Sequence, residues 1–451
     1  MVYSIIKKSQ VQVAHRFDAE YYQPKYLDAK QKLEAIKTTT IGEISKTVVN
    51  FGAYSLCNYI TWQEKGVPYL NVENIKAGYI DFEGVKYIDA EINEILKKSK
   101  VKEGQVILTM AGTIGNAAVA HNIPEKLNSN QAMAKIALKK GFSPYYLAAF
   151  LNSYYGRRQT EREIVSSVQP NIFLWQIKNL RVPLVSENKQ KMIEEIYRCA
   201  LEAKECSGSL YSQAEELLID ELGLKDYKVA DELTYASDLS NIRSAHRMDA
   251  EYYQPKYQKL ISKLCDKNAK YLIEVVENVP ARFNPATKPN ERFRYIELAN
   301  IDSSIGIIDG CSEVIGIEAP SRAGRLLKTD DVIVSSIEGS LKNTAIVDSE
   351  QDGCLASTGF FQFRCKYIMP RVLLILARSF VVQMQLEKQC AGTILTAVPK
   401  EAIKNILIPV PPKSVQQKIS ELVQKSHEAR RKAKQLLEEA KQKVEKMISG
   451  E

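Results

Sequence analysis

The side chains in this chain that are best suited to a chemical task are arginines, lysines and amides in predicted loops, and their chemistry suits nucleic acid. Arginine and asparagine can form paired hydrogen bonds to guanine and adenine edges, whereas lysine mainly holds phosphates. The candidates of this kind are Asn71, Asn74, Lys76, Arg157, Arg158, Arg282, Arg292, Arg294, Arg322 and Arg325. Each could equally be a solvated surface group, so the residue types alone leave both interpretations open.

Two glycine-containing turns add a candidate phosphate site to each half of the chain. They read TMAGTIGN at 109–116 and SSIEGSLKN at 335–343, and each follows an apolar run. Glycine lacks a Cβ, so backbone N–H groups and small hydroxyls there can approach a phosphate closely. The candidates are Thr109, Gly112, Thr113, Asn116, Ser335, Gly339, Ser340, Lys342 and Asn343. An ordinary tight turn explains the same residues, and Lys342 stands where the first turn has Gly115.

Catalytic motifs are missing from the sequence. There is no Gly-Lys dipeptide for a Walker A loop, no Gly-x-Gly, and no Asn-Pro-Pro-Tyr or Asp-Pro-Pro-Tyr tetrapeptide of the amino-methyltransferase type. The four histidines are scattered, and the eight cysteines form no Cys-x-x-Cys pair that would indicate a zinc site. We therefore expect no catalytic residue, metal or cofactor in this chain.

An internal repeat shows how the chain is organised. Residues 14–26 read AHRFDAEYYQPKY, and residues 245–257 read AHRMDAEYYQPKY. Weaker echoes follow in the same order, for example VKEGQVILT at 101–109 against LKTDDVIVS at 327–335. The chain is therefore a tandem duplication of one fold.

Each half changes from a strand pattern to a helix pattern. Short β-rich runs with Gly, Asn and Pro between them indicate a mixed α/β or α+β globule. A helix then follows, with Ser186 as its cap and Gly223 as its stop in the first half, and with its start at Ser414 in the second. The predicted segments are a globular domain at 1–185, a helix at 186–222, a linker at 223–244, a second domain at 245–413 and a second helix at 414–451.

Both helices carry apolar or small residues at alternating steps of three and four. This spacing is typical of a coiled-coil seam, whereas a helix packed only on its own domain shows a broader apolar stripe. We predict that the helices pair antiparallel and place the two domains at opposite ends, about a pseudo-twofold axis. The predicted seam positions are Ile193, Ile196, Ala200, Ala203, Leu210, Ala214, Leu217, Ile419, Leu422, Ala429, Ala433, Leu436 and Ala440, with Ser207 and Ser426 in the same rows.

Length and composition bound the class of protein. The chain has 451 residues, of which 45% are hydrophobic and 26% charged, as in folded proteins of two or three domains. It contains no apolar run near the roughly 18 residues of a membrane span and no secretory signal at its start, so we expect a cytoplasmic protein without a membrane contact. The net charge of +8 mildly favours a polyanionic partner.

Taken together, these features resemble the specificity subunits of type I restriction–modification systems. The resemblance is carried by the repeated AHR-x-DAEYYQPKY openings, the runs EGQVILTMAGTIGNAAVA and DDVIVSSIEGSLKNTAIV, and the helix entries IKNLRVPLVSENKQKMIEEI and IKNILIPVPPKSVQQKISEL. The first helix entry departs from the pattern, because it lacks the Pro411–Pro412 junction of the second.

The resemblance implies a DNA reader without catalysis. Two target-recognition domains would bind an asymmetric, split sequence in double-stranded DNA, and the paired helices would separate them. Two methylation subunits and restriction or translocase subunits would be the protein partners, and they would hold S-adenosylmethionine, ATP and Mg²⁺. Two alternatives remain: a stand-alone DNA modification enzyme with unrecognised motifs, and a coiled-coil adaptor that does not contact DNA.

Overall fold

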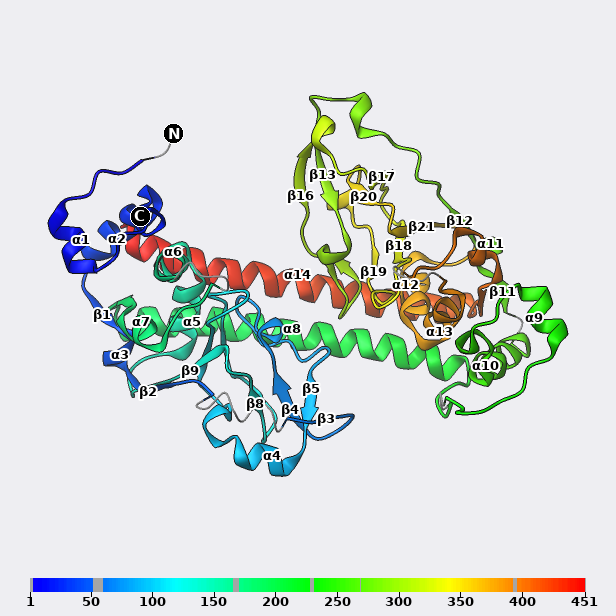
Figure 1. Cartoon of the computed structure of the whole chain (residues 1–451), viewed down its shortest axis with the longest axis horizontal. Helices are drawn as coiled ribbons and strands as arrows, with labels where there is room; N and C mark the ends of the chain where they lie inside the picture. The colour runs from blue at the N-terminus through cyan, green and yellow to red at the C-terminus, as the bar shows by residue number, and fades with distance from the viewer. Residues whose placement is uncertain are drawn as a thin grey trace. The chain divides into compact units, whose positions relative to one another are not determined.

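The protein is described by a computed structural model that covers residues 3–51, 60–164, 170–227, 231–267, 269–391 and 396–450. It divides into two compact units. Unit 1 consists of Met1–Lys204 and Arg431–Glu451, and unit 2 consists of Glu205–Arg430. Both division points fall inside long helices, so each unit contains one domain and a section of both helices (Figure 1).

Short strands and helices alternate in the domain of unit 1. Its helices are α1 (Lys8–Ala14), α2 (Pro24–Glu34), α3 (Ile41–Ile44), α4 (Ala90–Ile95), α5 (Pro144–Asn152), α6 (Tyr154–Glu163) and α7 (Leu174–Asn179). Its strands are β1 (Thr38–Thr40), β2 (Ser45–Val49), β3 (Trp62–Gln63), β4 (Val67–Leu70), β5 (Lys86–Ile88), β6 (Val106–Thr109), β7 (Ala117–Val119), β8 (Asn128–Ser129), β9 (Met133–Leu138) and β10 (Arg181–Pro183).

Two four-stranded sheets build this domain. The first has the antiparallel order β2-β9-β6-β7, and the second has the order β3-β5-β4-β8 with β4 parallel to β8. Strand β6 is buried along its whole length, which explains why the run Val106–Thr109 shows no polar alternation. One face of the first sheet packs on α5, in which every residue after Pro144 is buried. The other face of the first sheet packs on the second sheet. Ile107 of the first sheet and Leu70 of the second belong to one smaller core there.

The domain of unit 2 repeats this arrangement. Its helices are α9 (Leu239–Ala245), α10 (Pro255–Cys265), α11 (Leu272–Val275), α12 (Pro370–Arg378) and α13 (Phe380–Gln389). Its strands are β11 (Lys270–Tyr271), β12 (Val276–Asn278), β13 (Arg292–Ile296), β14 (Ile301–Asp302), β15 (Ile307–Ile308), β16 (Ser312–Ile315), β17 (Ala323–Leu326), β18 (Val332–Ser335), β19 (Thr344–Ile346), β20 (Leu355–Ser357), β21 (Phe360–Cys365) and β22 (Leu407–Ile408).

The sheet orders of the two domains match. The order β12-β21-β18-β19 repeats that of the first sheet of unit 1, and β16-β13-β20 repeats β5-β4-β8, including the parallel pairing of its last two strands. The domains differ at the sheet edges, where unit 1 adds β3 and unit 2 adds β17. The predicted class, α/β or α+β domains with long helices, is confirmed.

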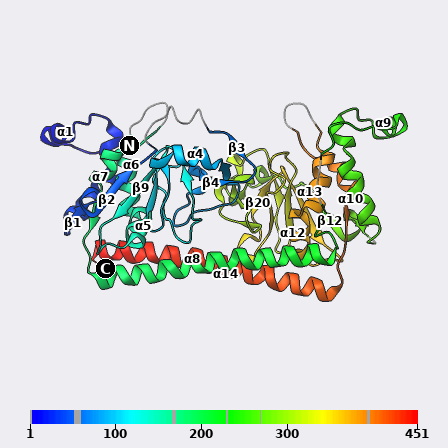
Figure 2. The same ribbon diagram turned by 90° about the horizontal axis from the view of Figure 1, so that it is seen from below.

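The long helices are α8 (Glu187–Glu221) and α14 (Lys413–Ser449), and each end lies within two residues of the predicted one. Unit 1 holds the first part of α8 and the last part of α14, and unit 2 holds the other parts. In unit 1 both helices contribute to one core, with Ile193 from α8 and Val444 from α14. In unit 2 the Ser207 and Ser426 hydroxyls are 3.2 Å apart. Helices that pack in both units in this way run antiparallel (Figures 1 and 2).

The predicted seam is narrower than the apolar surface that the helices bury. All the predicted seam positions are buried or half-buried. However, Tyr197, Leu201, Leu218 and Val423 are buried as well, and they belong to the cores of the two domains. Each helix therefore serves both the helix pair and its own domain, which requires a broader apolar stripe than the predicted seam alone.

In the part of the chain that the structure describes, no helix combines the length and apolarity needed to cross a membrane.

Candidate nucleic-acid interface

The glycine turn of unit 1 is held from inside by residues that we predicted to contact DNA. Thr109 is fully buried, and its hydroxyl donates to the Thr113 carbonyl at 2.5 Å and accepts from the Asn116 N–H at 2.9 Å. Arg157 donates to the Ile114 carbonyl at 3.2 Å and to Asn116 Oδ1 at 2.6 Å. Burial lowers the pKa of the Arg157 guanidinium from its ordinary value. Thr109, Asn116 and Arg157 therefore shape the turn, and their contact with DNA stays a prediction.

Two asparagines are also used internally. Asn74 is buried, and its side chain accepts from the Asn71 N–H at 2.8 Å and donates to the Asp81 carbonyl at 3.0 Å. The Asn343 amide donates to the Leu298 carbonyl at 3.1 Å. Both amides fix the loop after a strand of the second sheet.

Arg325 and Ser335 are buried in unit 2. Arg325 donates to the Val279 carbonyl at 2.7 Å, and burial lowers its pKa to about 10. The Ser335 hydroxyl is 3.0 Å from that of Ser340 and accepts from the Ile337 N–H at 3.1 Å. Arg325 and Ser335 are therefore desolvated and have internal partners, and their contact with DNA stays a prediction.

The remaining candidates of unit 1 are at the surface. Gly112 and Thr113 are exposed at the tip of the turn, whereas Asn71 and Lys76 are half-buried. Arg158 is held by Glu161, with 2.6 Å between Nη1 and Oε2, and its guanidinium lies over a tyrosine ring. The turn tip is therefore the part of the predicted site that a phosphate can reach.

The second turn differs from the first in its backbone. Gly339 has φ +77° and is exposed, as Gly112 is with φ +69°. Gly115 has φ +87°, and a Cβ there would lie 3.2 Å from Arg157 and Thr160. Lys342 is exposed and has no positive φ. The second turn has Lys342 where the first has Gly115, so the backbone of the two turns differs there. The two turns share only the exposed glycine with positive φ, Gly112 in one and Gly339 in the other.

Exposed arginines of unit 2 lie on strand β13 and in loops of the same domain. Residues of β13 alternate: Phe293 and Tyr295 are buried in a small core, while Arg292 and Arg294 are exposed on the other face. Arg292 faces Glu313 across the sheet at 3.8 Å, and both side chains are more than 70% exposed. Arg294 has no hydrogen-bond or ion-pair partner among the described residues. Arg282, in the segment before β13, and Arg322, directly before β17, are also exposed.

The matching strand of unit 1 presents different chemistry. Gly66 and Pro68 stand at the positions that Arg292 and Arg294 occupy in unit 2. The exposed group nearby is Trp62 of β3, with the Lys86 ammonium 4.8 Å from its ring centre. Such an aromatic surface can contact a thymine methyl, whereas arginine suits guanine. Lys86 is not among the residues predicted from the sequence, because nothing in the sequence marks a single lysine as the partner of Trp62.

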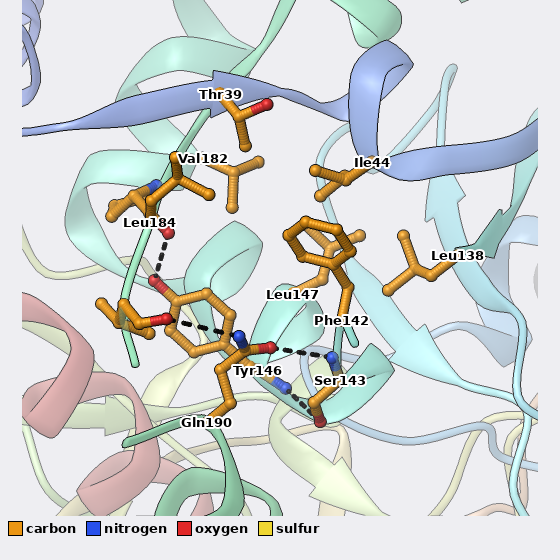
Figure 3. Close-up of a pocket in the computed structure, with 12 residues that line it drawn as sticks. Thr39, Ile44, Leu138, Phe142, Ser143, Tyr146, Leu147, Val182, Leu184 and Gln190 are labelled. Carbon is orange, nitrogen blue, oxygen red and sulfur yellow. Dashed lines mark hydrogen bonds between the residues drawn. The ribbon is translucent and has the colours of Figure 1, made fainter. Parts of the chain in front are cut away.

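The pocket shown in Figure 3 is structural. It lies where α8 begins and is lined mainly by apolar side chains such as Ile44 and Leu147. Gln190 accepts from the Ser143 N–H at 2.9 Å and so ties the first turn of α8 to the start of α5. Gln416 does the same in unit 2, accepting from the Met369 N–H at 3.0 Å. This bond gives a physical reason for the glutamine near the start of each long helix. Across the described ranges, no group of three or more His, Cys, Asp or Glu side chains could hold a metal ion.

Comparison with known proteins fits this geometry. Residues 33–197 match the family model of the type I restriction modification DNA specificity domain. This stretch is similar to the type I specificity domain. The resemblance noted in the sequence is confirmed, and the matched stretch runs from the end of α2 into α8 and includes both sheets of unit 1.

Two curated relatives are specificity subunits, and one of them matches most of the chain. A specificity subunit named for the type I restriction enzyme MjaX of Methanocaldococcus jannaschii is 22% identical over 447 residues, covering 92% of this chain and 96% of the relative. The type I restriction enzyme EcoBI specificity subunit of Escherichia coli is 28% identical over 131 residues, 28% of this chain and 27% of the relative. The crystal structure of an S subunit from M. genitalium aligns with a TM-score of 0.44 and 14% identity, over 91% of this chain and 95% of that one.

Proposed function

We propose that this chain is the DNA-reading subunit of a type I restriction–modification enzyme and that it recognises an asymmetric, bipartite target. The observation that carries the proposal is that the two domains share one arrangement of strands but expose different side chains. The sheet orders of the two domains match, yet β13 exposes Arg292 and Arg294 where the strand of unit 1 has Gly66 and Pro68. Two copies of one domain with different exposed side chains would read two different sequence blocks.

The chemistry of each surface suggests what its block contains. Arginine makes its best base contact with guanine O6 and N7 in the major groove. The unit 2 block would therefore contain guanine, read from β13. Trp62 and Lys86 would supply an apolar contact and a phosphate contact in unit 1, which suits a block with a thymine methyl.

The helix pair would set the distance between the blocks. Helix α8 has 35 residues and α14 has 37, so each is roughly 50 Å long at 1.5 Å per residue. Because B-DNA rises about 3.4 Å per base pair, a spacer of this size suits two read blocks with several unread base pairs between them.

Methyl transfer and DNA cleavage would be carried out by other subunits. Two methylation subunits would bind this chain and transfer the methyl group of S-adenosylmethionine to adenine, and restriction or translocase subunits would use ATP and Mg²⁺. This chain would supply base and phosphate contacts and no catalytic residue, and the complex would work in the cytoplasm, where the DNA is.

Methylome sequencing of cells with and without this chain tests the proposal. We expect methylated adenines within one asymmetric, gapped motif, present only when the chain is expressed. A motif that persists without the chain, or a contiguous palindrome, would contradict it.

Two assays separate the proposal from the alternatives. Purified chain with S-adenosylmethionine and duplex DNA should transfer no methyl group until the methylation subunits are added; transfer by the chain alone would make it an enzyme. A gel shift against random duplex should show weak, salt-sensitive binding, and none would favour a coiled-coil adaptor.

A further inference from the structure

The arginine-bearing strand of unit 2 leads directly into a hairpin that is fastened to α14. Strand β13 ends at Ile296, and β14 and β15 follow as a short antiparallel pair. The carboxylate of Asp302, the last residue of β14, meets the Arg430 guanidinium of α14 with 2.6 Å between Oδ2 and Nη2. His427, one helical turn earlier, donates from Nε2 to the Ile305 carbonyl at 2.9 Å. The hairpin is therefore attached at two points on one face of α14.

The ion pair is buried and well satisfied. The side chains of Asp302 and Arg430 are 10% and 11% exposed. The second carboxylate oxygen of Asp302 accepts from the backbone N–H of Ser304 at 3.0 Å and from its hydroxyl. Burial alone would raise the pKa of Asp302, but the Arg430 charge and the Ser304 hydrogen bonds outweigh it, so the pKa is below its ordinary value.

The segment that connects the arginines of β13 to Asp302 is short and held by hydrogen bonds. Between β13 and β14 the chain forms one 3-10 turn, Leu298–Asn300. The Asn300 side chain accepts from the Glu297 N–H at 2.9 Å, and the Leu298 carbonyl accepts from Asn343. A displacement of Asp302 would therefore be passed along the chain to Arg294.

A buried ion pair suits a positioning task better than a stabilising one. Desolvation cancels much of its attraction, so replacing both partners by apolar residues is often neutral for stability. Its geometry is directional, whereas apolar packing is not. Unit 2 also has a large core that joins its domain to both helices. The core can hold the domain in place, and the pair can define its orientation.

We propose that Asp302 and Arg430 are positioning residues: together they fix β13 at one orientation on α14 and so restrict recognition to one gap length. This inference rests on the proposed function. The pair belongs to unit 2 alone. In unit 1, Lys76 and Lys204 stand at the corresponding positions and cannot form an ion pair with each other. There Lys204 lies over the Tyr79 ring, 4.6 Å from its centre.

The test is a gap-selection experiment on this chain assembled with its methylation subunits. Duplexes carry the two wild-type blocks separated by the native gap or by one base pair fewer or more. Wild type should discriminate against the altered gaps by about tenfold or more, because DNA must otherwise twist and stretch to fit. The variant Asp302→Leu with Arg430→Met should discriminate less than about threefold while still requiring both blocks.

Three controls isolate the pair. Asp331→Asn with Arg364→Gln removes another ion pair of unit 2, with 3.0 Å between its charged atoms and no residue on α14, and should leave gap discrimination unchanged. Asp302→Glu with Arg430→Lys lengthens the acidic side chain and shortens the basic one while keeping both charges. This variant should discriminate between gaps as wild type does. Asp302→Asn changes the fold least and should relax the gap even if the double apolar variant unfolds.

Strict gap discrimination in Asp302→Asn, or in a folded Asp302→Leu/Arg430→Met complex, overturns the positioning role. Equal relaxation in the Asp331/Arg364 control also overturns it, because general loosening of the domain would then suffice. The proposed function fails in a different way, since wild-type complex would then select no bipartite motif.

Discussion

Lys135 places an amine inside unit 1. Its side chain is fully buried, and Nζ donates a hydrogen bond to the Ser129 hydroxyl at 3.1 Å. Desolvation lowers its pKa to about 7. The strand registers show that Gln362 occupies the corresponding place in unit 2, opposite Ile333 as Lys135 is opposite Ile107. A neutral amide thus fills in one domain the position that an ionisable amine fills in the other.

This residue should make the stability of the protein depend on pH. The unfolded chain keeps the lysine protonated up to its ordinary pKa, while the folded chain loses that proton near pH 7. The unfolded state therefore binds more protons between about pH 7 and 10, and the free energy of unfolding should rise with pH across that window. Lys135→Met should remove this slope and stabilise the protein at pH 7 by up to about 4 kcal/mol. Urea unfolding at pH 6, 7.5 and 9 measures both effects.

Lys140→Met is the matched control, because Lys140 is exposed on the loop after the same strand. It should leave the pH slope as in wild type. If Lys135→Met kept the wild-type slope, the lysine would be protonated and solvated in the folded state, contrary to its burial.

The elements of this protein were largely predictable, whereas the roles of its polar side chains were not. Gly223, with φ +64°, ends α8 as expected, and the heptad spacing identified both long helices. Arg325 and Arg294 look alike in the sequence, yet one is buried and the other exposed. The difference comes from register, because alternate residues of a strand face opposite sides and the pairing partner decides which side is covered. A single sequence does not specify that partner.

At the scale of strand β13, Arg294 gives the sharpest test of base reading. Arg294→Ala should relax recognition at one or two positions of one block, at a cost of about 1–3 kcal/mol there, and leave the other block unchanged. Arg294→Lys should rescue affinity but not selectivity, because lysine cannot form the paired contact. Methylome sequencing with each variant reads both blocks at once. Arg243→Ala, on the exposed face of α9, is the control and should change neither block. Loss of both blocks together would indicate unfolding.

The phosphate contacts of the whole molecule should determine how steeply DNA binding depends on salt concentration. A DNA interface built on phosphate contacts releases counterions, so the logarithm of affinity should fall steeply and linearly with the logarithm of salt concentration. Lys342→Ala, at the exposed turn of unit 2, should lower this slope by about one while leaving the motif unchanged. Fluorescence anisotropy of the complex on its own target measures the slope. A flat response would exclude a phosphate-based interface.

Insertions in α8 and α14 can test whether the paired helices set the gap between the two DNA blocks. The division between units falls after Lys204 in α8 and after Arg430 in α14, at corresponding positions of the duplication. One heptad inserted at both points preserves the seam and the two domain cores, and it lengthens the pair by about 10 Å, or about three base pairs of B-DNA. The preferred gap should grow by that amount while both blocks stay the same. An insertion in α8 alone should instead shift Ser207 away from Ser426 and weaken binding at every gap. If the matched insertion folds and keeps the original gap, the distance between the blocks is set by something other than the paired helices.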